Sequence, residues 1–444
     1  MQLYRHILLF TLLFATCFGA QSLDGTDITG IESIVQAVEQ PDERWRKEAE
    51  DRIREHRKAN IKLHIVHGGK PVTNATVRIK LTRHAFRFGG IVSARSMTYG
   101  QGSLSANEYR QHFLDFGFNT AGFNNGLKYK LRKGNETLIP ELLDWFEKNR
   151  IPVRGHCLIW PGRDHMSKEM TALVEECQSD PSKKNRRKLE ALCEEQIETW
   201  APKWNVFEWD VINETRGNFH VAELLGEEIY TDWFRLARRH AVQRNAGLYL
   251  NENRVVSDPE PEVLSKKFRL YIEAVKKLLK EKAPISGLGM QSRFHAMTPA
   301  ETIFDRLEEL AEFDLPIAAT EFEIGDPVGG DLNKAVMTER VMTVYFSHPL
   351  VNGIYAWTLM GLDNVEDSGR GVFETDGHPT LCGKVWLYLM KSHWITDEQL
   401  STDEKGSISL RGFLGEYEIT IEHNGRTKTF PLTLDKNLRQ TIRL

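Results

Sequence analysis

Apolar residues in the middle of the chain gather in short, nearly continuous clusters, separated by longer stretches with the spacing of amphipathic helices. Such clusters are typical of strands buried on both faces, and helices between them require the strands to run parallel. The clusters that we mark as strands are residues 86–92, 117–123, 152–160, 206–213, 247–251, 287–291, 317–322 and 353–358. Eight parallel strands over about 300 residues predict an α/β fold, a closed (β/α)8 TIM barrel, over residues 86–395.

In the segment before the barrel, apolar residues recur with two other spacings, first that of a helix and then that of a strand. Residues 30–58 are highly charged and have helical spacing, so we predict a helical segment there. Residues 59–85 contain two runs, 61–65 and 77–81, in which apolar and polar residues alternate. This alternation is typical of strands with one solvated face, and the Gly-Gly-Lys-Pro turn between them predicts a β-hairpin.

Alternation returns after the barrel. Residues 396–444 hold three short alternating runs joined by glycine-containing turns, of which Asn424-Gly425 is a strong hairpin signal. Three strands alone are only marginally stable. We therefore predict that this tail joins residues 59–85 in a small accessory β-sandwich built from the N- and C-terminal segments.

The first residues have the pattern of a secretory signal peptide. Arg5 precedes the apolar run 7–14, and small residues follow it, so we expect residues 1–20 to be removed and the protein to be secreted, to an extracellular or periplasmic location. A lipid anchor at Cys17 is the alternative, which Thr16 before it disfavours. Other apolar runs are too short to span a bilayer, so we expect no membrane partner.

Composition and cysteine spacing exclude several classes of function. Hydrophobic residues make up 41% and charged residues 27% of the chain, as in ordinary globular proteins, and the net charge is −4. Without a basic excess we expect no nucleic-acid partner, and we expect a monomer. Since no Cys-x-x-Cys pair occurs, we predict no metal and no other cofactor. Cys177 and Cys193 flank a helix–helix connection, and the sequence leaves open whether they form a disulfide.

Two glutamates are the candidates for chemistry. A TIM barrel builds its active site at the carboxyl ends of its strands. Glu214 follows the fourth predicted strand and Glu321 lies at the end of the seventh, on opposite sides of the barrel mouth. Glycoside hydrolysis requires such a pair, one carboxyl group protonated to assist the leaving oxygen and one ionised. A separation of about 5–5.5 Å gives retention of configuration, and about 6.5–9.5 Å gives inversion.

Polar and aromatic residues lie at several other strand ends. Sugar sites need planar apolar surfaces with hydrogen-bonding groups at their rims. The candidate substrate-binding residues are Asn125, Lys128, His156, Trp160, Asn213, Gln291, Arg293 and Trp357. Each is a weak indication alone, and their distribution over several strand ends indicates a binding site.

Short motifs in the barrel region occur in a consistent order. They are G-H-C-L-I-W at 155–160, W-D-V-I-N-E at 209–214, G-L-G-M-Q at 287–291, T-E-F-E at 320–323 and F-E-T-D-G-H-P at 373–379. Together with Asn125 and Lys128, they resemble the motifs of the family 10 glycoside hydrolases, the β-1,4-xylanase family. The resemblance covers roughly residues 86–390 and implies that Glu214 is the acid/base, that Glu321 is the nucleophile and that configuration is retained.

The chain also departs from this family pattern. Asn124 stands where the family has a sugar-binding Glu, Pro161 where it has His, and Arg163 where a Gln often contacts sugar. The loop at residues 361–367 lacks the tryptophan usual there. The sequence therefore indicates the reaction more firmly than it indicates xylan as the substrate.

Arg293 is the most consequential departure, since the family has a His there that hydrogen-bonds the nucleophile. An arginine beside Glu321 favours the ionised form that a nucleophile needs. A planar guanidinium is also suited to a bidentate contact with the carboxylate of a glucuronic acid substituent.

The sequence thus predicts a secreted retaining glycoside hydrolase, an endo-β-1,4-xylanase that cleaves xylan by double displacement. Two alternatives stay open: a glycosidase of the same mechanism acting on another β-glycan, and a non-catalytic glycan-binding barrel. The presence of both glutamates favours an enzyme, because a binding protein has no need of the pair.

Overall fold

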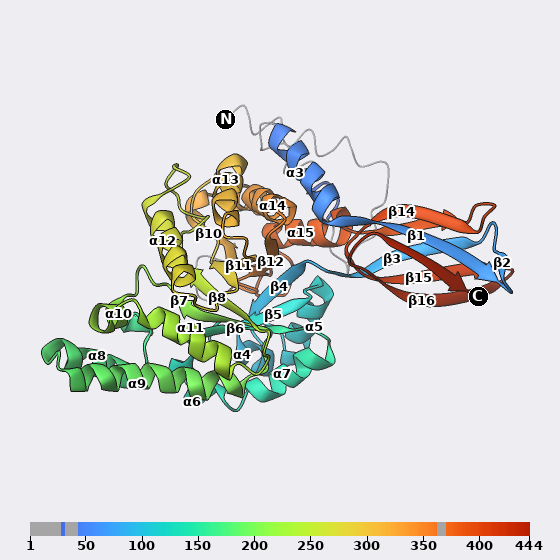
Figure 1. Cartoon of the computed structure of the whole chain (residues 1–444). Helices are drawn as coiled ribbons and strands as arrows, with labels where there is room; N and C mark the ends of the chain where they lie inside the picture. Colours follow the sequence, from blue (N-terminus) through green and yellow to red (C-terminus); the bar gives the residue numbers. More distant parts are fainter. Residues whose placement is uncertain (1–27, 32–42, 362–369) are drawn as a thin grey trace.

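The computed structural model describes residues 28–31, 43–361 and 370–444 (Figure 1). The predicted signal peptide at residues 1–20 lies outside the described residues. So do residues 32–42 of the predicted helical segment and most of the loop at 361–367.

Eight parallel strands close into a ring within the described part of the chain, and helices surround it (Figure 1). In order around the ring they are β4 (Arg87–Val92), β5 (Thr120–Phe123), β6 (Val153–Ile159), β7 (Glu208–Asn213), β8 (Gly247–Glu252), β9 (Gly287–Met290), β11 (Ile317–Ile324) and β12 (Val351–Ala356). Pairing of β12 with β4 completes the closure, and the short strand β10 (Arg293–Phe294) adds to β11. The predicted (β/α)8 barrel and its eight strands are confirmed, with ends shifted by a few residues.

Most helices around the barrel bury one face, as their spacing predicts, whereas the helix Asp331–Ser347 is buried on nearly all sides and the short helix Arg132–Asn135 has no buried residue. The helices are α4 (Ala94–Tyr99), α5 (Ala106–Phe116), α6 (Arg132–Asn135), α7 (Ile139–Lys148), α8 (Lys168–Ser179), α9 (Lys183–Trp200), α10 (His220–Leu225), α11 (Ile229–His240), α12 (Lys266–Lys280), α13 (Ala300–Ala311), α14 (Asp331–Ser347) and α15 (Leu381–Tyr388). In α5, capping residues explain where the helix begins and ends. Ser105 and Glu108 form a reciprocal capping box at its start, and Gly117 adopts φ +91° at its end.

The interior of the barrel holds a chain of ion pairs rather than a purely apolar core. Arg154 on β6 binds Asp210 on β7 through two hydrogen bonds of 2.9 and 2.7 Å, and it binds Glu208 at 3.0 Å. Arg87 on β4 reaches the other Glu208 oxygen at 3.0 Å. Removing one member of such a buried network leaves an uncompensated charge, so the network fixes the side chains that point toward the barrel mouth.

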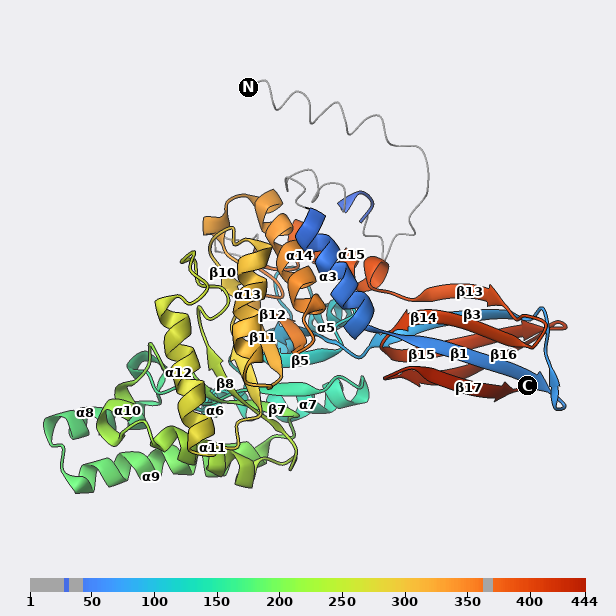
Figure 2. The ribbon, with the colours of Figure 1, turned by 45° about the horizontal axis from the view of Figure 1, so that its top comes forward.

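Two four-stranded sheets form the accessory β-sandwich among the described residues, beside the barrel (Figure 2). One contains β1 (Lys58–His67), β2 (Lys70–Pro71), β14 (Ser407–Phe413) and β17 (Leu438–Arg443). The other contains β3 (Thr76–His84), β13 (Asp397–Ser401), β15 (Gly415–His423) and β16 (Arg426–Leu434). The predicted union of the two chain ends is confirmed, and the tail has more strands than the three that we predicted.

The predicted β-hairpin over residues 59–85 is wrong. Strands β1 and β3 do not pair with one another but lie in the two different sheets. β1 pairs in parallel with β17, whereas β3 pairs with β15. Alternation specifies which face of a strand is buried but not which strand lies beside it. The predicted turn at Asn424-Gly425 does join a hairpin, β15–β16, with positive φ at both residues.

An aromatic cluster joins the sandwich to the barrel. Phe346 of α14 stacks on Trp394 with ring centroids 4.2 Å apart, and Phe413 of β14 lies 6.1 Å from Phe346. The helix α3 (Glu43–His56) packs on α14, and Arg46 forms an ion pair with Glu339 there. The sandwich and the barrel therefore share a continuous core.

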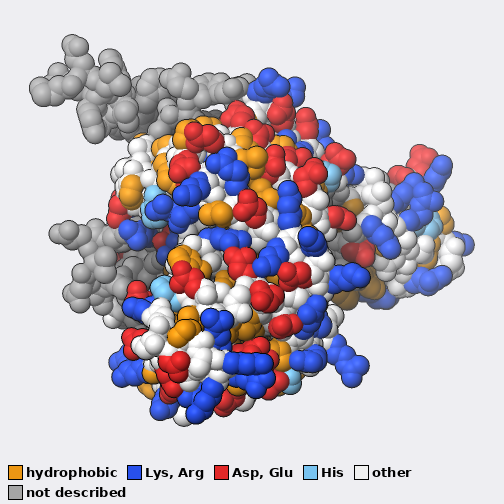
Figure 3. Space-filling view, turned by 60° about the vertical axis from the view of Figure 1, so that its left-hand side comes forward, with side chains coloured by type: hydrophobic (Ala, Val, Ile, Leu, Met, Phe, Trp, Pro, Cys, Tyr) orange, Lys and Arg blue, Asp and Glu red, His pale blue; other side chains and the backbone are white. Residues whose placement is uncertain are grey.

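The surface and the cysteines bear on the remaining predictions. On the face that carries the left-hand helices of Figure 1, basic and acidic side chains are interspersed (Figure 3). Cys177 and Cys193 are both buried and unpaired, so the disulfide that the sequence left open is not formed in this structure. Among the described residues, no helix has the length and apolarity needed to cross a bilayer.

Candidate active site

Of the two candidate glutamates, one directly follows β7 and the other lies in the carboxyl-terminal half of β11. Glu214 directly follows β7 and adopts φ +59°, a left-handed conformation that is uncommon for a residue with a side chain. Its backbone N–H donates to the Asn251 carbonyl at 2.8 Å, which holds the turn in place. Local strain of this kind is concentrated at functional sites. Glu321 lies within β11 and is 2% exposed.

Neutral donors surround the half-buried carboxylate of Glu214. The Gln291 amide donates to Oε1 at 2.6 Å. The Asn218 amide and the Trp160 indole N–H donate to Oε2 at 2.7 and 3.3 Å. This carboxyl group is therefore oriented by hydrogen bonds without a bound cation.

A cation and a buried amide hold Glu321. Arg293 donates from Nη2 to Oε2 at 2.6 Å, and Asn251 donates from Nδ2 to Oε1 at 3.0 Å. His156 Nε2 lies 3.9 Å from the same Oε1. These partners hold the Glu321 carboxyl group in one orientation at the barrel mouth.

Asn251 and Gln291 each contact both glutamates. The backbone carbonyl of Asn251 accepts the Glu214 N–H, and its side-chain amide donates to the Glu321 carboxylate. The side-chain amide of Gln291 donates to the Glu214 carboxylate, and its backbone carbonyl accepts the Glu321 N–H at 3.0 Å. The two glutamates consequently belong to one braced site at the barrel mouth. The structure thus brings the two predicted glutamates to one site, and their separate catalytic roles stay predictions.

His156 is held from behind by the ion pairs of the barrel interior. Its Nδ1 lies 2.8 Å from Asp210 Oδ2, and Asp210 is in turn bound by Arg154. Burial would raise the pKa of Asp210, but Arg154 and His156 outweigh it and lower that pKa. An ionised Asp210 fixes the orientation of the His156 ring beside Glu321.

A cationic and aromatic wall lines one side of the site. Lys128 is 7% exposed, donates to Asn125 at 3.1 Å and lies 4.7 Å from the Trp160 ring and 5.7 Å from the Trp357 ring. Burial lowers the pKa of Lys128. Asn125 itself is exposed. The four predicted substrate-binding residues in this wall thus lie together.

Asn213 has a spare donor. Its Oδ1 accepts from Asn251 at 2.9 Å, whereas its Nδ2 is buried and has no hydrogen-bond partner among the described residues. A buried donor without a partner costs free energy unless a ligand supplies the acceptor. A sugar hydroxyl is such an acceptor, in keeping with the predicted role of Asn213.

Arg293 is divided between two carboxylates. Besides Glu321 it lies 3.5 Å from Glu323, and its guanidinium lies 4.7 Å from the Trp357 ring. Burial alone would lower the pKa of Arg293, but Glu321 and Glu323 raise it, so the group stays charged. A substrate carboxylate at Arg293 would have to compete with both glutamates, which weakens the predicted contact with glucuronic acid.

The sequence analysis missed Asn251, Asn218 and Glu252. Asn251 and Glu252 end β8, so applying the strand-end rule to the fifth strand would have found them. Glu252 accepts the Arg216 N–H at 3.1 Å and the Thr215 hydroxyl at 3.2 Å, directly after Glu214. Burial, and then the charge of Glu214, raise the pKa of Glu252 to about 7. Asn218 lies in a loop, where no sequence signal marked it.

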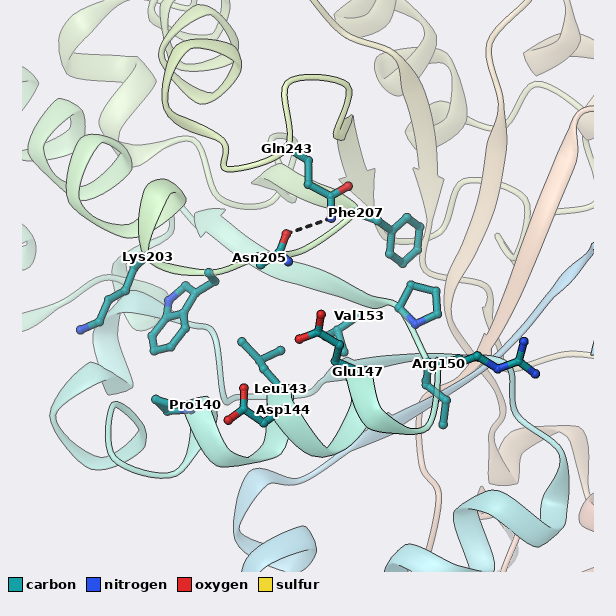
Figure 4. Close-up of a pocket in the computed structure, with 13 residues that line it drawn as sticks. Pro140, Leu143, Asp144, Glu147, Arg150, Val153, Lys203, Asn205, Phe207 and Gln243 are labelled. Atoms are coloured by element: carbon teal, nitrogen blue, oxygen red, sulfur yellow. Dashed lines mark hydrogen bonds between the residues drawn. The ribbon is translucent and has the colours of Figure 1, made fainter.

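A separate cavity of about 550 Å³ lies at the amino ends of β6 and β7 (Figure 4). Asn205, Glu147 and Arg150 line it, and Gln243 donates to Asn205 at 3.0 Å. Chemistry in TIM barrels occurs at the opposite end of the strands. Within the described ranges, no group of three or more His, Cys, Asp or Glu side chains is placed to hold a metal ion.

Comparison with protein-family models gives one match over most of the barrel. The matching model is that of glycosyl hydrolase family 10, and it covers residues 81–368. These residues contain both glutamates and all eight strands of the ring.

Two relatives illustrate the sequence similarity. The anti-sigma-I factor RsgI6 of Acetivibrio thermocellus is 29% identical over 402 residues, covering 88% of this chain and 48% of that protein. Endo-1,4-beta-xylanase 2 of Arabidopsis thaliana is 25% identical over 361 residues, covering 79% of this chain and 31% of that protein. The chain thus spans less than half the length of either relative.

Solved structures show the same barrel. Xylanase B from Clostridium stercorarium F9 superposes with a TM-score of 0.56 at 18% identity, over 69% of this chain and 97% of that one. Native xylanase10C from Cellvibrio japonicus gives a TM-score of 0.55 at 16% identity, over 69% and 71% of the two chains. At these identities the likeness establishes the fold.

Proposed function

The chain belongs to glycosyl hydrolase family 10, and on that premise we propose that it is a secreted, retaining endo-β-1,4-xylanase. The observation that carries the proposal is the pair Glu214 and Glu321, cross-braced by Asn251 and Gln291 at the barrel mouth. Two carboxyl groups that converge at one barrel mouth are what glycoside hydrolysis by an acid/base and a nucleophile requires.

In the proposed mechanism Glu321 attacks the anomeric carbon and forms a glycosyl-enzyme intermediate. Glu214 first gives its proton to the leaving oxygen and then, as a carboxylate, takes a proton from the attacking water. Trp160 and Gln291 hold Glu214 in place for both transfers, since both donate to its carboxylate. The residue types assigned to these steps need no metal and no organic cofactor.

Substrate binding is proposed for the residues around the pair. The cationic and aromatic wall, with His156 beside Trp357, pairs aromatic surface with hydrogen-bonding groups, as sugar sites do. Asn213 offers its unused amide donor. Secretion rests on the apolar run at residues 7–14 and the small residues after it.

Hydrolysis of xylan by the purified protein, beside Glu214→Gln and Glu321→Gln variants, tests the proposal. We expect wild type to release oligosaccharides and each variant to lose at least about two orders of magnitude in kcat/KM. Hydrolysis of another β-glycan in place of xylan would keep the mechanism and overturn the substrate. Proton NMR of the first product formed reports whether the anomeric configuration is retained.

A non-catalytic glycan-binding barrel is the second candidate. It is favoured by the departures at Asn124, Pro161 and Arg293 and by a relative, aligned over 88% of this chain, whose name is that of an anti-sigma factor. Binding of xylo-oligosaccharides without release of any product, unchanged in the Glu321→Gln variant, would support the binding barrel over the enzyme.

A further inference from the structure

A basic cavity lies beside the sugar-binding wall. It has a volume of about 630 Å³, within the range of small-ligand sites. Its charged lining residues are Arg95, Lys130, Arg132, Lys133, Lys168 and Glu169, and its neutral polar lining includes Asn124 and Asn125. Five cations and one carboxylate form a local excess of positive charge on a protein whose net charge is −4.

Within the described residues, Arg132 forms the one ion pair with a carboxylate among these five cations. Arg132 lies 3.5 Å from Glu169, the acidic residue of the lining. Lys130 donates to the Asp164 backbone carbonyl at 3.2 Å. No ion pair joins Arg95, Lys133 or Lys168 to any carboxylate in the described part of the chain, and all three are exposed. The first turn of α8, which begins at Lys168, adds the positive end of a helix dipole to the same lining.

The cavity lies next to the proposed catalytic site. Asn125 belongs to its lining and accepts the Lys128 hydrogen bond at 3.1 Å. Lys130 also belongs to the lining and lies 5.7 Å from the ring of Trp160, whose indole binds Glu214. A sugar chain seated on Trp160 and Lys128 therefore has its next residues within reach of the basic cavity.

We propose that this cavity binds an anionic substituent, a carboxylate or a sulfate ester, carried by the glycan next to the residues held in the active site. Asn124, where the family pattern has a sugar-binding Glu, supports this because a carboxylate at that place would repel an anionic ligand. Since the ligand is a glycan, the inference rests on the proposed function, but it concerns binding and is tested by binding.

The test compares three oligosaccharides of equal length by isothermal titration calorimetry. One is neutral xylo-oligosaccharide, one carries a glucuronic acid branch, and one carries a sulfate ester. The protein is the full chain, as wild type and as the triple variant Arg95→Gln, Lys133→Gln, Lys168→Gln. The matched control is Lys405→Gln, Arg426→Gln, Lys428→Gln, which removes the same charge from exposed residues of the β-sandwich.

We expect wild type to bind at least one anionic oligosaccharide roughly tenfold more tightly than the neutral one in dilute buffer, and to lose most of that preference in about 1 M salt. The cavity variant should lose the preference and the sandwich control should keep it. Tighter binding of the branched or of the sulfated probe identifies the anion.

Equal affinity of wild type for all three probes, or a preference that survives in the cavity variant, overturns the inference. Hydrolysis of neutral xylan, measured in parallel, reports on the proposed function alone. A protein that binds acidic probes through the cavity without hydrolysing xylan would keep the cavity and lose the xylanase assignment.

Discussion

Glu214 and Glu321 are the same residue type at the same end of one barrel, yet they have different surroundings. Glu214 is half-buried, itself adopts a left-handed backbone conformation and accepts hydrogen bonds from two amides and an indole. Glu321 is 2% exposed and bound by Arg293 and Asn251. Neutral amides and an indole surround one carboxyl group, whereas a guanidinium lies against the other. This difference in surroundings is what the proposed roles of acid/base and nucleophile would exploit.

Removing each carboxyl group in turn gives the largest expected effect. On an aryl glycoside whose leaving group is a good one, Glu321→Gln should lose roughly 10⁴-fold in kcat/KM, because no nucleophile remains. Glu214→Gln should form the glycosyl-enzyme at a near-normal rate, because that leaving group needs no proton. Pre-steady-state release of the phenol measures both, and a burst from the Glu321 variant would reverse the assignment.

Breaking the support behind Glu321 should mainly affect stability. Asp210→Asn leaves Arg154 and Arg87 to share Glu208 as their remaining carboxylate, so one charge in the interior network is uncompensated and we expect the free energy of unfolding to fall by about 3–5 kcal/mol. Urea denaturation measures this value. Glu176→Gln, which removes an exposed ion pair with Lys188, should cost no more than about 1 kcal/mol. Equal losses of unfolding free energy in the two variants would mean that the ion pairs of the barrel interior stabilise the protein no more than an exposed ion pair does.

Glu252, which lies close to Glu214, should make the stability of the protein depend on pH. Its folded-state pKa of about 7 exceeds the value of about 4.3 expected in an unfolded chain. Between those values the folded protein holds a proton that the unfolded chain has released, so stability falls as the pH rises through this window, by roughly 4 kcal/mol in total.

The Glu252→Gln variant should lose this part of the slope. Chemical denaturation at pH values from 4 to 8 measures the difference between the two proteins. Glu273→Gln, an exposed change on α12, is the matched control and should follow the wild-type curve. A Glu252 variant that follows the wild-type curve as well would show that this carboxyl group is ionised throughout.

Replacing Arg293, the cation beside Glu321, should have the smallest of these effects. Arg293→Gln removes a charged hydrogen bond at 2.6 Å, for which a loss of about tenfold to a hundredfold in kcat/KM is expected. Arg293→Lys keeps the charge and should lose less. If both variants lose equally, the geometry of the guanidinium matters more than its charge; if neither loses activity, Asn251 and His156 suffice to hold the nucleophile.

Much of the barrel was accessible from the sequence because its signals are local. Each strand is a short apolar cluster and each helix has its own spacing, so the eight strands and the positions of Glu214 and Glu321 at their ends could be assigned one at a time. The sandwich was harder. Its strands were recognised by alternation, but β1 and β3 were paired wrongly because pairing depends on segments far away in the chain, such as β17.

The site divides in the same way. The two glutamates and the eight substrate-binding candidates follow from strand ends and motifs, whereas Asn251 and Glu252 were overlooked and Asn218 carries no local signal. The basic cavity is harder still to predict from the sequence, since its cations come from three separate segments, at Arg95, Lys130–Lys133 and Lys168.

The sequence by itself determined the periods, the order of the elements and the residue types available at each strand end, because these depend on neighbours along the chain. Only the tertiary structure decided which carboxylate meets Arg293, which amide braces both glutamates and which two sheets the chain ends form. Those outcomes depend on contacts between residues distant in sequence, whose free energies arise only when closure of the barrel brings them together.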